Sequence, residues 1–274
     1  MTTPIKIEVG FDLTYECVNP TPMLVTMNVH PSRERDLLTP DTLMTDPPLP
    51  IHSYIDGFGN RCARLVAPSG ATRFYSRATV QDMREPDAYV PMARQVPVEY
   101  LPDDVLVFLL GSRYCDTDRL AGWAWQMFGW TTPGWARVQA VCDWVHNHIQ
   151  FDYQRADPTR TAHGAWEAAT GVCRDFTHLA VTTLRCLNIP ARYCTGYIPD
   201  IDVELPPVLP PMDFCAWLEV YLDGTWYTFD PRNNVRRIGR ILMARGRDAT
   251  DVAISNTFGQ NLLTSFTVYC DQVS

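Results

Sequence analysis

A cysteine stands where a glycine-containing turn leads into a predicted helix, in the segment Gly171-Val172-Cys173-Arg174-Asp175-Phe176. The first N–H groups of a helix have no partner inside the helix, and the helix dipole is positive at this end. Both features stabilise a thiolate, the nucleophilic form of cysteine, and can hold a developing oxyanion. A small buried residue also suits this position. Cys173 is therefore a candidate nucleophile with a lowered thiol pKa, and we expect Arg174 and Asp175 to cap or salt-bridge the first turn.

Strand patterns follow the predicted helix. Cys215 lies near the start of the apolar pattern FCAWLEVYL, and Asp230 lies near the end of the pattern TWYTFDP, after a turn at Asp223 and Gly224.

The segments GVCRDFTHLAVTTLRCLNIPARYCTGY and DFCAWLEVYLDGTWYTFDPRNN resemble the bacterial transglutaminase-like superfamily of the cysteine protease type. The resemblance extends to SRYCDTDRL, WVHNHIQFDY and GRDATDVAISNTFG, and it covers residues 100–274 more strongly than the preceding part. It implies a papain-type core in which a cysteine at a helix start, a histidine on one strand and an aspartate on the next form a triad. Cys173 then occupies the nucleophile position and Asp230 the acid position.

The chain departs from that pattern at the histidine. Where the family has Asp-Phe-His-Ala-Trp, residues 213–217 read Asp-Phe-Cys-Ala-Trp, and all six histidines precede Cys215. The resulting Cys-Cys-Asp site lacks the imidazole that normally accepts and returns the nucleophile's proton. Two neighbouring thiols titrate as a coupled pair, which predicts one thiolate and one thiol near neutral pH.

Other residues near the site are candidates for auxiliary roles. His178 lies five residues after Cys173 on the same predicted helix, about 140° around its axis, so we expect it to be packed away from the thiol. His163, in the preceding loop, is able to fold over the site, although a loop histidine is usually solvated. Trp217 is either a core residue or a pocket wall.

Three classes of function fit these residues. The first is acyl transfer or amide hydrolysis on a carbonyl-containing small molecule or peptide, with Cys173 as nucleophile. The second is proton abstraction and return by two thiols, as in an isomerase, racemase or lyase. The third is a catalytically inactive binding module that retains the fold. A zinc site formed by Cys173, Cys215 and Asp230, or a redox disulfide between the two cysteines, is a further alternative, but we predict neither a cofactor nor a metal.

The composition of the chain limits which classes of binding partner and which location we expect. The net charge is −8, and no run of five like charges occurs, which argues against a nucleic-acid or anionic-membrane surface. No apolar stretch approaches the ~20 residues that span a bilayer, and the N-terminus begins as an alternating strand, so we expect a cytoplasmic protein. The nine cysteines form no C-x-x-C pair, and we expect most of them to be reduced and buried.

The elements that must position these residues form two parts. Alternating segments punctuated by Pro and Gly turns predict an antiparallel β domain over residues 1–98, ending in a Pro-rich linker. Helical periodicity follows over 116–127, 135–149 and 173–187, and then strand patterns, so residues 99–274 are expected to form the transglutaminase-like domain, with helices packed on an antiparallel sheet. The Pro-rich stretch 203–212 is expected to be an exposed crossover loop. The fold class is α+β.

Overall fold

Two antiparallel sheets occupy the N-terminal part of the chain in the computed structural model, which describes residues 3–203 and 212–273. Their strand orders are β14-β1-β6-β3 and β13-β2-β5-β4. The bounds are β1 Ile5–Cys17, β2 Thr21–Val25, β3 Met44–Asp46, β4 His52–Ile55, β5 Arg61–Ala67, β6 Gly70–Asp82, β13 Ser255–Thr257 and β14 Asn261–Val273, with a short helix η1 at Pro31–Asp36. Alternate residues of β1 and β6 are buried, as expected for sheets with one face on a core.

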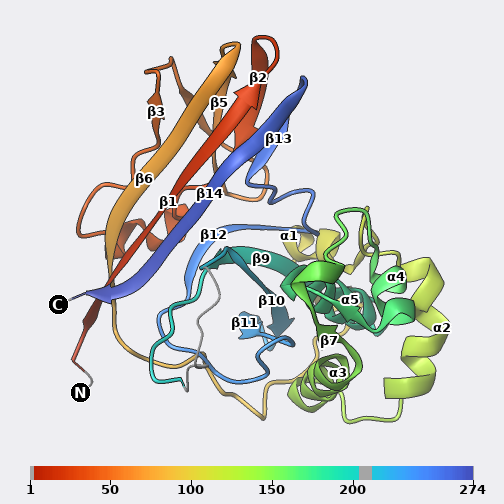
Figure 1. The fold of residues 1–274 in the computed structure, drawn as a ribbon. Helices are drawn as coiled ribbons and strands as arrows, with labels where there is room; N and C mark the ends of the chain where they lie inside the picture. Colours follow the sequence, from red (N-terminus) through yellow and green to blue (C-terminus); the bar gives the residue numbers. More distant parts are fainter. Residues whose placement is uncertain (1–2, 204–211, 274) are drawn as a thin grey trace.

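The last strands of the chain belong to these N-terminal sheets. β14 pairs antiparallel with β1 from Lys6↔Val273 to Cys17↔Asn261, and β13 pairs with β2. Figure 1 shows β14, in blue, lying beside β1, in red. From the sequence, these residues are expected in the second domain, 99–274. In the structure they pair instead with strands of the first domain. The alternation of LTSFTVYC marks a strand but does not identify its partner.

Helices fill the middle of the chain. They are η2 Val98–Tyr100, α1 Asp103–Leu106, η3 Val107–Leu109, α2 Thr117–Phe128, α3 Trp135–His148, η4 Tyr153–Arg155, α4 Ala162–Ala168 and α5 Cys173–Cys186. The three longer predicted helices are thereby confirmed to within two residues at each end. Two short parallel strands, β7 Gln150–Phe151 and β8 Thr170–Gly171, precede α5.

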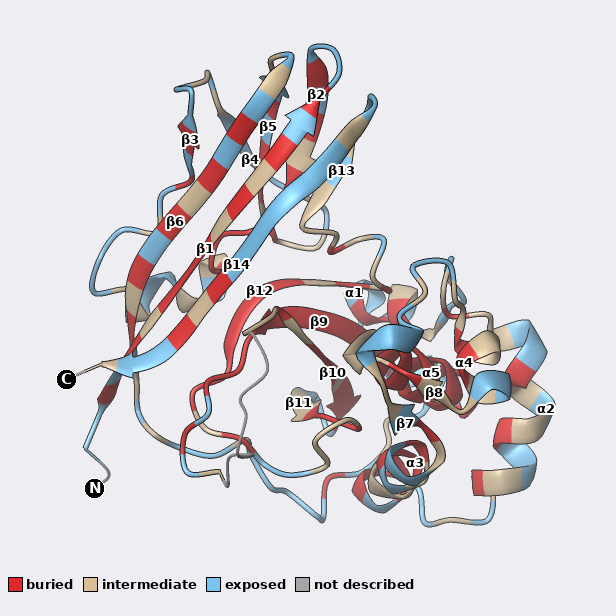
Figure 2. Cartoon of the chain, in the orientation of Figure 1, coloured by how far each residue is buried: buried red, intermediate tan, exposed pale blue. Residues whose placement is uncertain are grey.

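A third sheet, of order β11-β10-β9-β12, carries α5 on one face. Its strands are β9 Ala191–Tyr197, β10 Cys215–Leu222, β11 Thr225–Phe229 and β12 Ile241–Gly246. Leu179 and Leu184 of α5 share a buried core with Leu218 and Val220 of β10. Figure 2 shows α5 and β9 buried along their lengths. The predicted α+β arrangement of helices on an antiparallel sheet is confirmed.

The third sheet also packs against the N-terminal sheets. Tyr197 of β9 and Ile241 and Met243 of β12 belong to the same buried cluster as Ile7 and Val9 of β1. The two parts therefore share apolar core at the β9–β12 edge. Most of the Pro-rich stretch 203–212 lies outside the described residues, so its predicted role as a crossover loop is untested.

No helix in the described part of the chain has the length and apolar character needed to cross a bilayer.

Candidate active site

Cys173 is the first residue of α5, and a buried carboxylate fixes the backbone there. The Val172 N–H donates to Asp175 Oδ2 at 2.8 Å, which is the side chain to backbone half of a capping box. Arg160 donates to the same oxygen at 3.4 Å. A Cβ at Gly171 would lie 2.4 Å from Asp175 Oδ2, so this position needs glycine. The predicted capping role of Asp175 is confirmed.

The Cys173 thiol faces the start of β10. It packs against Tyr193 and Ala216, and the Ala216 N–H acts to lower the pKa of the thiol. Burial nevertheless raises the thiol pKa to about 11, against a lowering by that N–H and by the nearby Arg232. The lowered pKa expected from the helix start is therefore wrong, because the cost of burying a thiolate exceeds the stabilisation by these groups.

Cys215 is the first residue of β10, where it pairs with Gly196 of β9. Its thiol donates to the Asp213 carbonyl at 3.8 Å and packs with Trp217 and Cys194, whereas Ala216 next to it packs with Cys173. Burial and, as the next largest cause, the charge of Cys173 raise the pKa of the Cys215 thiol to about 12. Both thiols are free, and each is protonated near neutral pH, which differs from the predicted thiolate–thiol pair.

Asp230, directly after β11, is buried in a hydrogen-bonded turn. Its carboxylate accepts from the Asn233 N–H at 3.0 Å and from Asn233 Nδ2 at 2.7 Å. Arg240 donates to it from both Nη atoms at 3.1 Å and also bonds Asp87 in the linker. None of these hydrogen bonds comes from Cys215, so the acid position is oriented toward an arginine.

Arg232 is the residue near both thiols that the sequence analysis missed. Its guanidinium lies 4.2 Å from the ring centroid of Phe151, and its charge lowers the pKa of Cys173 and of Cys215 against the larger effect of burial. The signal was available, because Arg232 stands two residues after Asp230 in the same turn.

Tyr153 and Asp213 also lie near the thiols. Burial raises the pKa of the Tyr153 phenol, and the charges of Asp213 and both cysteines add to the rise. The Asp213 carboxylate accepts from the Phe214 N–H at 2.7 Å, and burial raises its pKa. Near the thiols, the Tyr153 phenol and the Asp213 carboxyl group therefore stay protonated to a higher pH than they would in water.

The two candidate histidines make their contacts elsewhere. His163 lies on α4, with Nδ1 3.3 Å from Glu167 and its ring against Trp166. His178 is buried between Tyr114 and Tyr193, and its Nε2 accepts from the Ala249 N–H at 3.2 Å. Burial lowers the pKa of His178 to about 3. The expectation that His178 is a packed helix residue is confirmed.

Trp217 is buried on the face of β10 that carries Cys215. The Arg240 guanidinium lies 5.0 Å from its ring centroid, and both side chains line a cavity of about 260 Å³. Trp217 is thus a core residue that also forms part of a cavity wall beside Arg240. It belongs to a different buried cluster from the one that packs against Cys173.

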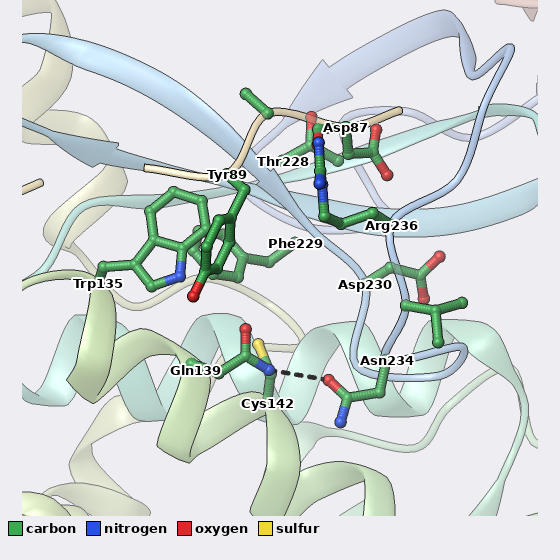
Figure 3. Close-up of a pocket in the computed structure, with 12 residues that line it drawn as sticks. Asp87, Tyr89, Trp135, Gln139, Cys142, Thr228, Phe229, Asp230, Asn234 and Arg236 are labelled. Carbon is green, nitrogen blue, oxygen red and sulfur yellow. Dashed lines mark hydrogen bonds between the residues drawn. The ribbon is translucent and has the colours of Figure 1, made fainter. Parts of the chain in front are cut away.

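A second, smaller cavity reaches Asp230 from the side of α3. Its volume is about 130 Å³, and Trp135, Gln139 and Cys142 of α3 form one wall. Figure 3 shows these residues opposite Phe229 and Asp230, with Gln139 bonded to Asn234. Neither Cys173 nor Cys215 lines it. This cavity is therefore separate from the thiol site.

Among the described residues, no three His, Cys, Asp or Glu side chains are grouped so that they could hold a metal ion. Cys173, Cys215 and Asp230 do not form such a group, since the Asp230 carboxylate is engaged by Asn233 and Arg240.

Comparison with known proteins supports the same fold. Residues 122–231 match the family model of the transglutaminase-like superfamily. The whole chain is similar to a protein of Cytophaga hutchinsonii described as a "putative cysteine protease", with 30% identity, a TM-score of 0.85 and coverage of 100% of this chain and 92% of that one.

Two further similarities are more limited. An uncharacterized protein of Mycobacterium leprae is 31% identical over 118 residues, so the match spans 42% of this chain and 42% of that protein. The periplasmic domain of TgpA from Pseudomonas aeruginosa is 15% identical, with a TM-score of 0.42 over 84% of this chain and 90% of that one. That last likeness is too distant to bear on function.

Proposed function

Because this chain belongs to the transglutaminase-like superfamily, we propose that it is a cysteine-dependent enzyme that performs acyl transfer or amide hydrolysis with Cys173 as nucleophile. The substrate is a carbonyl-containing small molecule or peptide. The observation that carries the proposal is the position of Cys173, which is the first residue of α5 and packs against Tyr193 and Ala216 of the neighbouring strands. Burial raises the pKa of both thiols, and the charge of Arg232 acts to lower both.

The reaction runs through a thioester. Cys173 gives its proton to solvent, its sulfur bonds to the carbonyl carbon, and the carbonyl electron pair moves to oxygen. When the oxyanion collapses, the C–N bond breaks and the leaving amine takes the proton of Cys215. Water or an acceptor amine then attacks the thioester and gives a proton to the Cys215 thiolate. The C–S bond breaks, and Cys173 regains a proton from solvent.

Asp230 acts in this scheme as a positioning residue. Its carboxylate fixes the turn through Asn233 and holds Arg240 beneath Trp217. The same turn carries Arg232, whose charge acts to lower the pKa of both thiols. The variant Cys-Cys-Asp site thus uses Cys215 for proton transfer and the arginines for charge compensation.

Acid–base chemistry by the two thiols is the second candidate. After burial, the charge of Cys173 is the largest cause of the raised pKa of Cys215, so a proton on one thiol depends on the state of the other. Such a pair is suited to removing and returning a proton at a carbon next to a carbonyl. This reaction would leave no acyl group on Cys173.

Trapping the acyl-enzyme separates the two candidates. We expect p-nitrophenyl acetate at pH 9 to leave an acetyl group on Cys173, detected by peptide mass mapping, and the Cys173→Ala variant to lose it. Cys62→Ala removes a buried thiol of β5 and serves as the matched control. If no activated ester acylates Cys173, the acyl-transfer proposal is contradicted. Incorporation of solvent deuterium into 2-amino or 2-hydroxy acids, followed by NMR, supports the two-thiol reaction instead.

A further inference from the structure

We infer that Arg232 binds a carboxylate of the substrate, so that the enzyme acts on carbonyl compounds that carry an anionic group close to the carbon attacked by Cys173. The inference rests on the proposed role of Cys173 and names the substrate class of that same site. It is carried by the position of a stacked guanidinium near the start of α5 that forms no ion pair with a carboxylate of the described residues.

Phe151 fixes where the guanidinium lies. The Arg232 guanidinium carbon is 4.2 Å from the Phe151 ring centroid. Phe151 pairs with Gly171 across β7 and β8, two residues before Cys173, and its ring is 6.5 Å from that of Phe176 in the first turn of α5. Stacking on Phe151 therefore holds Arg232 at the end of the helix where Cys173 stands.

Asn233 holds the turn that presents Arg232. Its Nδ2 donates to Asp230 Oδ2 at 2.7 Å, while its Oδ1 accepts from Arg232 Nη1 at 3.3 Å. The buried Asp230 thus anchors one side of the amide and Arg232 the other. A guanidinium held on two sides loses little conformational freedom when a ligand binds.

The charge of Arg232 is uncompensated. Within residues 3–203 and 212–273, Arg232 forms no ion pair with a carboxylate, and Asp230, two residues before it in the sequence, is paired with Arg240. The thiols do not neutralise it at neutral pH, because burial raises the pKa of both far above 7. A half-buried guanidinium of this kind binds carboxylates through two parallel N–H···O bonds.

The substrate class follows from this placement. A carboxylate on Arg232 brings the neighbouring carbonyl carbon to the Cys173 sulfur. An amide, ester or thioester with a free carboxylate near the reacting group meets this requirement. The interior of a polypeptide chain has no such carboxylate, except one provided by a side chain. The site is therefore suited to small acids or chain ends.

Paired alkylating reagents test the inference without the natural substrate. Iodoacetate and iodoacetamide react alike: the Cys173 sulfur bonds to carbon, the C–I bond breaks, iodide leaves and the thiol proton goes to solvent. They differ in charge. We expect Arg232→Gln to lower the iodoacetate-to-iodoacetamide rate ratio at Cys173 at least tenfold, measured by peptide mass mapping at pH 9. The ratio cancels any change in the thiol pKa, which affects both reagents equally.

Two matched variants sharpen the result. Arg174→Gln removes the same charge from the residue next to Cys173, but Arg174 donates to the Asp157 and Pro158 carbonyls and lies over Tyr114, so the ratio should stay unchanged. Arg232→Lys keeps the charge and should lose less of the ratio than Arg232→Gln. In the wild-type protein, propionate should slow labelling of Cys173 by iodoacetamide, and propionamide should not.

The outcomes separate the inference from the proposed function. If Arg232→Gln leaves the ratio unchanged and propionate gives no protection, the anion site is refuted while Cys173 as nucleophile stands. If neither reagent labels Cys173 in the wild-type protein, both fall. If Arg232→Gln fails to fold, protection of the wild-type thiol by propionate still decides.

Discussion

The Arg240 guanidinium donates two hydrogen bonds of 3.1 Å to one carboxylate oxygen of Asp230 and bonds Asp87 of the linker at 3.0 Å. In a Cys-His-Asp triad the acid orients the imidazole. Here the acid position faces a cation instead, and one arginine joins the linker to the turn after β11. Asp87, Arg240 and Asp230 thus form a buried charge cluster, in which the Arg240 guanidinium lies over the ring of Trp217.

Removal of the Arg240 charge should destabilise the fold strongly. Arg240→Gln leaves Asp87 and Asp230 close together without a cation, and losing one partner of a buried ion pair costs ~3–5 kcal/mol. We expect this loss in the free energy of unfolding, measured by urea denaturation at pH 7. Arg84→Gln, which breaks an exposed pair with Asp202, is the control, and should cost no more than ~1 kcal/mol. Equal losses in both variants would show that the cluster adds no stability.

Restoring the missing imidazole should activate Cys173. Histidine at position 215 can accept the Cys173 proton, and a paired imidazolium lowers a neighbouring thiol pKa by several units. We expect Cys215→His to raise the iodoacetamide rate at Cys173 at pH 7 by a factor of ten or more. Cys215→Ser, which offers no base, should leave the rate near that of the wild type. An unchanged rate in the histidine variant would mean that residue 215 is not in reach of the nucleophile.

The local structure around two candidate residues could be predicted because it carries local signals. Cys173 begins a helix whose apolar stripe is continuous, and Asp230 directly follows a strand and precedes a proline. Arg240 could not be placed in the same way, since it meets Asp87 across 153 residues of chain. The thiol pKa was predicted in the wrong direction because the degree of burial depends on tertiary packing, which sequence position alone does not give.

The C-terminal strands show the same limit for the fold. The alternation of LTSFTVYC indicates a strand near the end of the chain, but its partner β1 lies almost the whole chain length away in the sequence, so local pattern does not identify it. We expect deletion of residues 255–274 to abolish folding of the N-terminal sheets, because β1 then loses a neighbour along its whole length. The β-sheet signal in circular dichroism of the purified protein would report this. A truncated chain that unfolds as cooperatively as the wild type would argue for an independent N-terminal unit.

The reactivity of Cys173 should rise with pH. The thiolate is the reactive form, and burial raises the pKa of this thiol to about 11, so the thiolate fraction increases about tenfold per pH unit below that value. We expect the iodoacetamide rate at Cys173 to climb from pH 7 to pH 10 without a plateau. In Cys215→His the plateau should appear at lower pH. A wild-type plateau below pH 8 would show that Cys173 is already ionised there.

His178 should make the protein sensitive to acid. Its pKa is lowered from 6.5 to about 3 because the ring is buried between Tyr114 and Tyr193. Between those values the unfolded chain binds the proton and the folded chain does not, so stability is present above pH 6.5 and falls as the pH drops toward 3. One such group contributes a slope of at most ~1.4 kcal/mol per pH unit. We expect His178→Gln to reduce the slope of unfolding free energy between pH 6 and 4, and the exposed-residue variant His52→Gln to leave it unchanged. Equal slopes in the wild type and His178→Gln would indicate that the ring takes up its proton in the folded state.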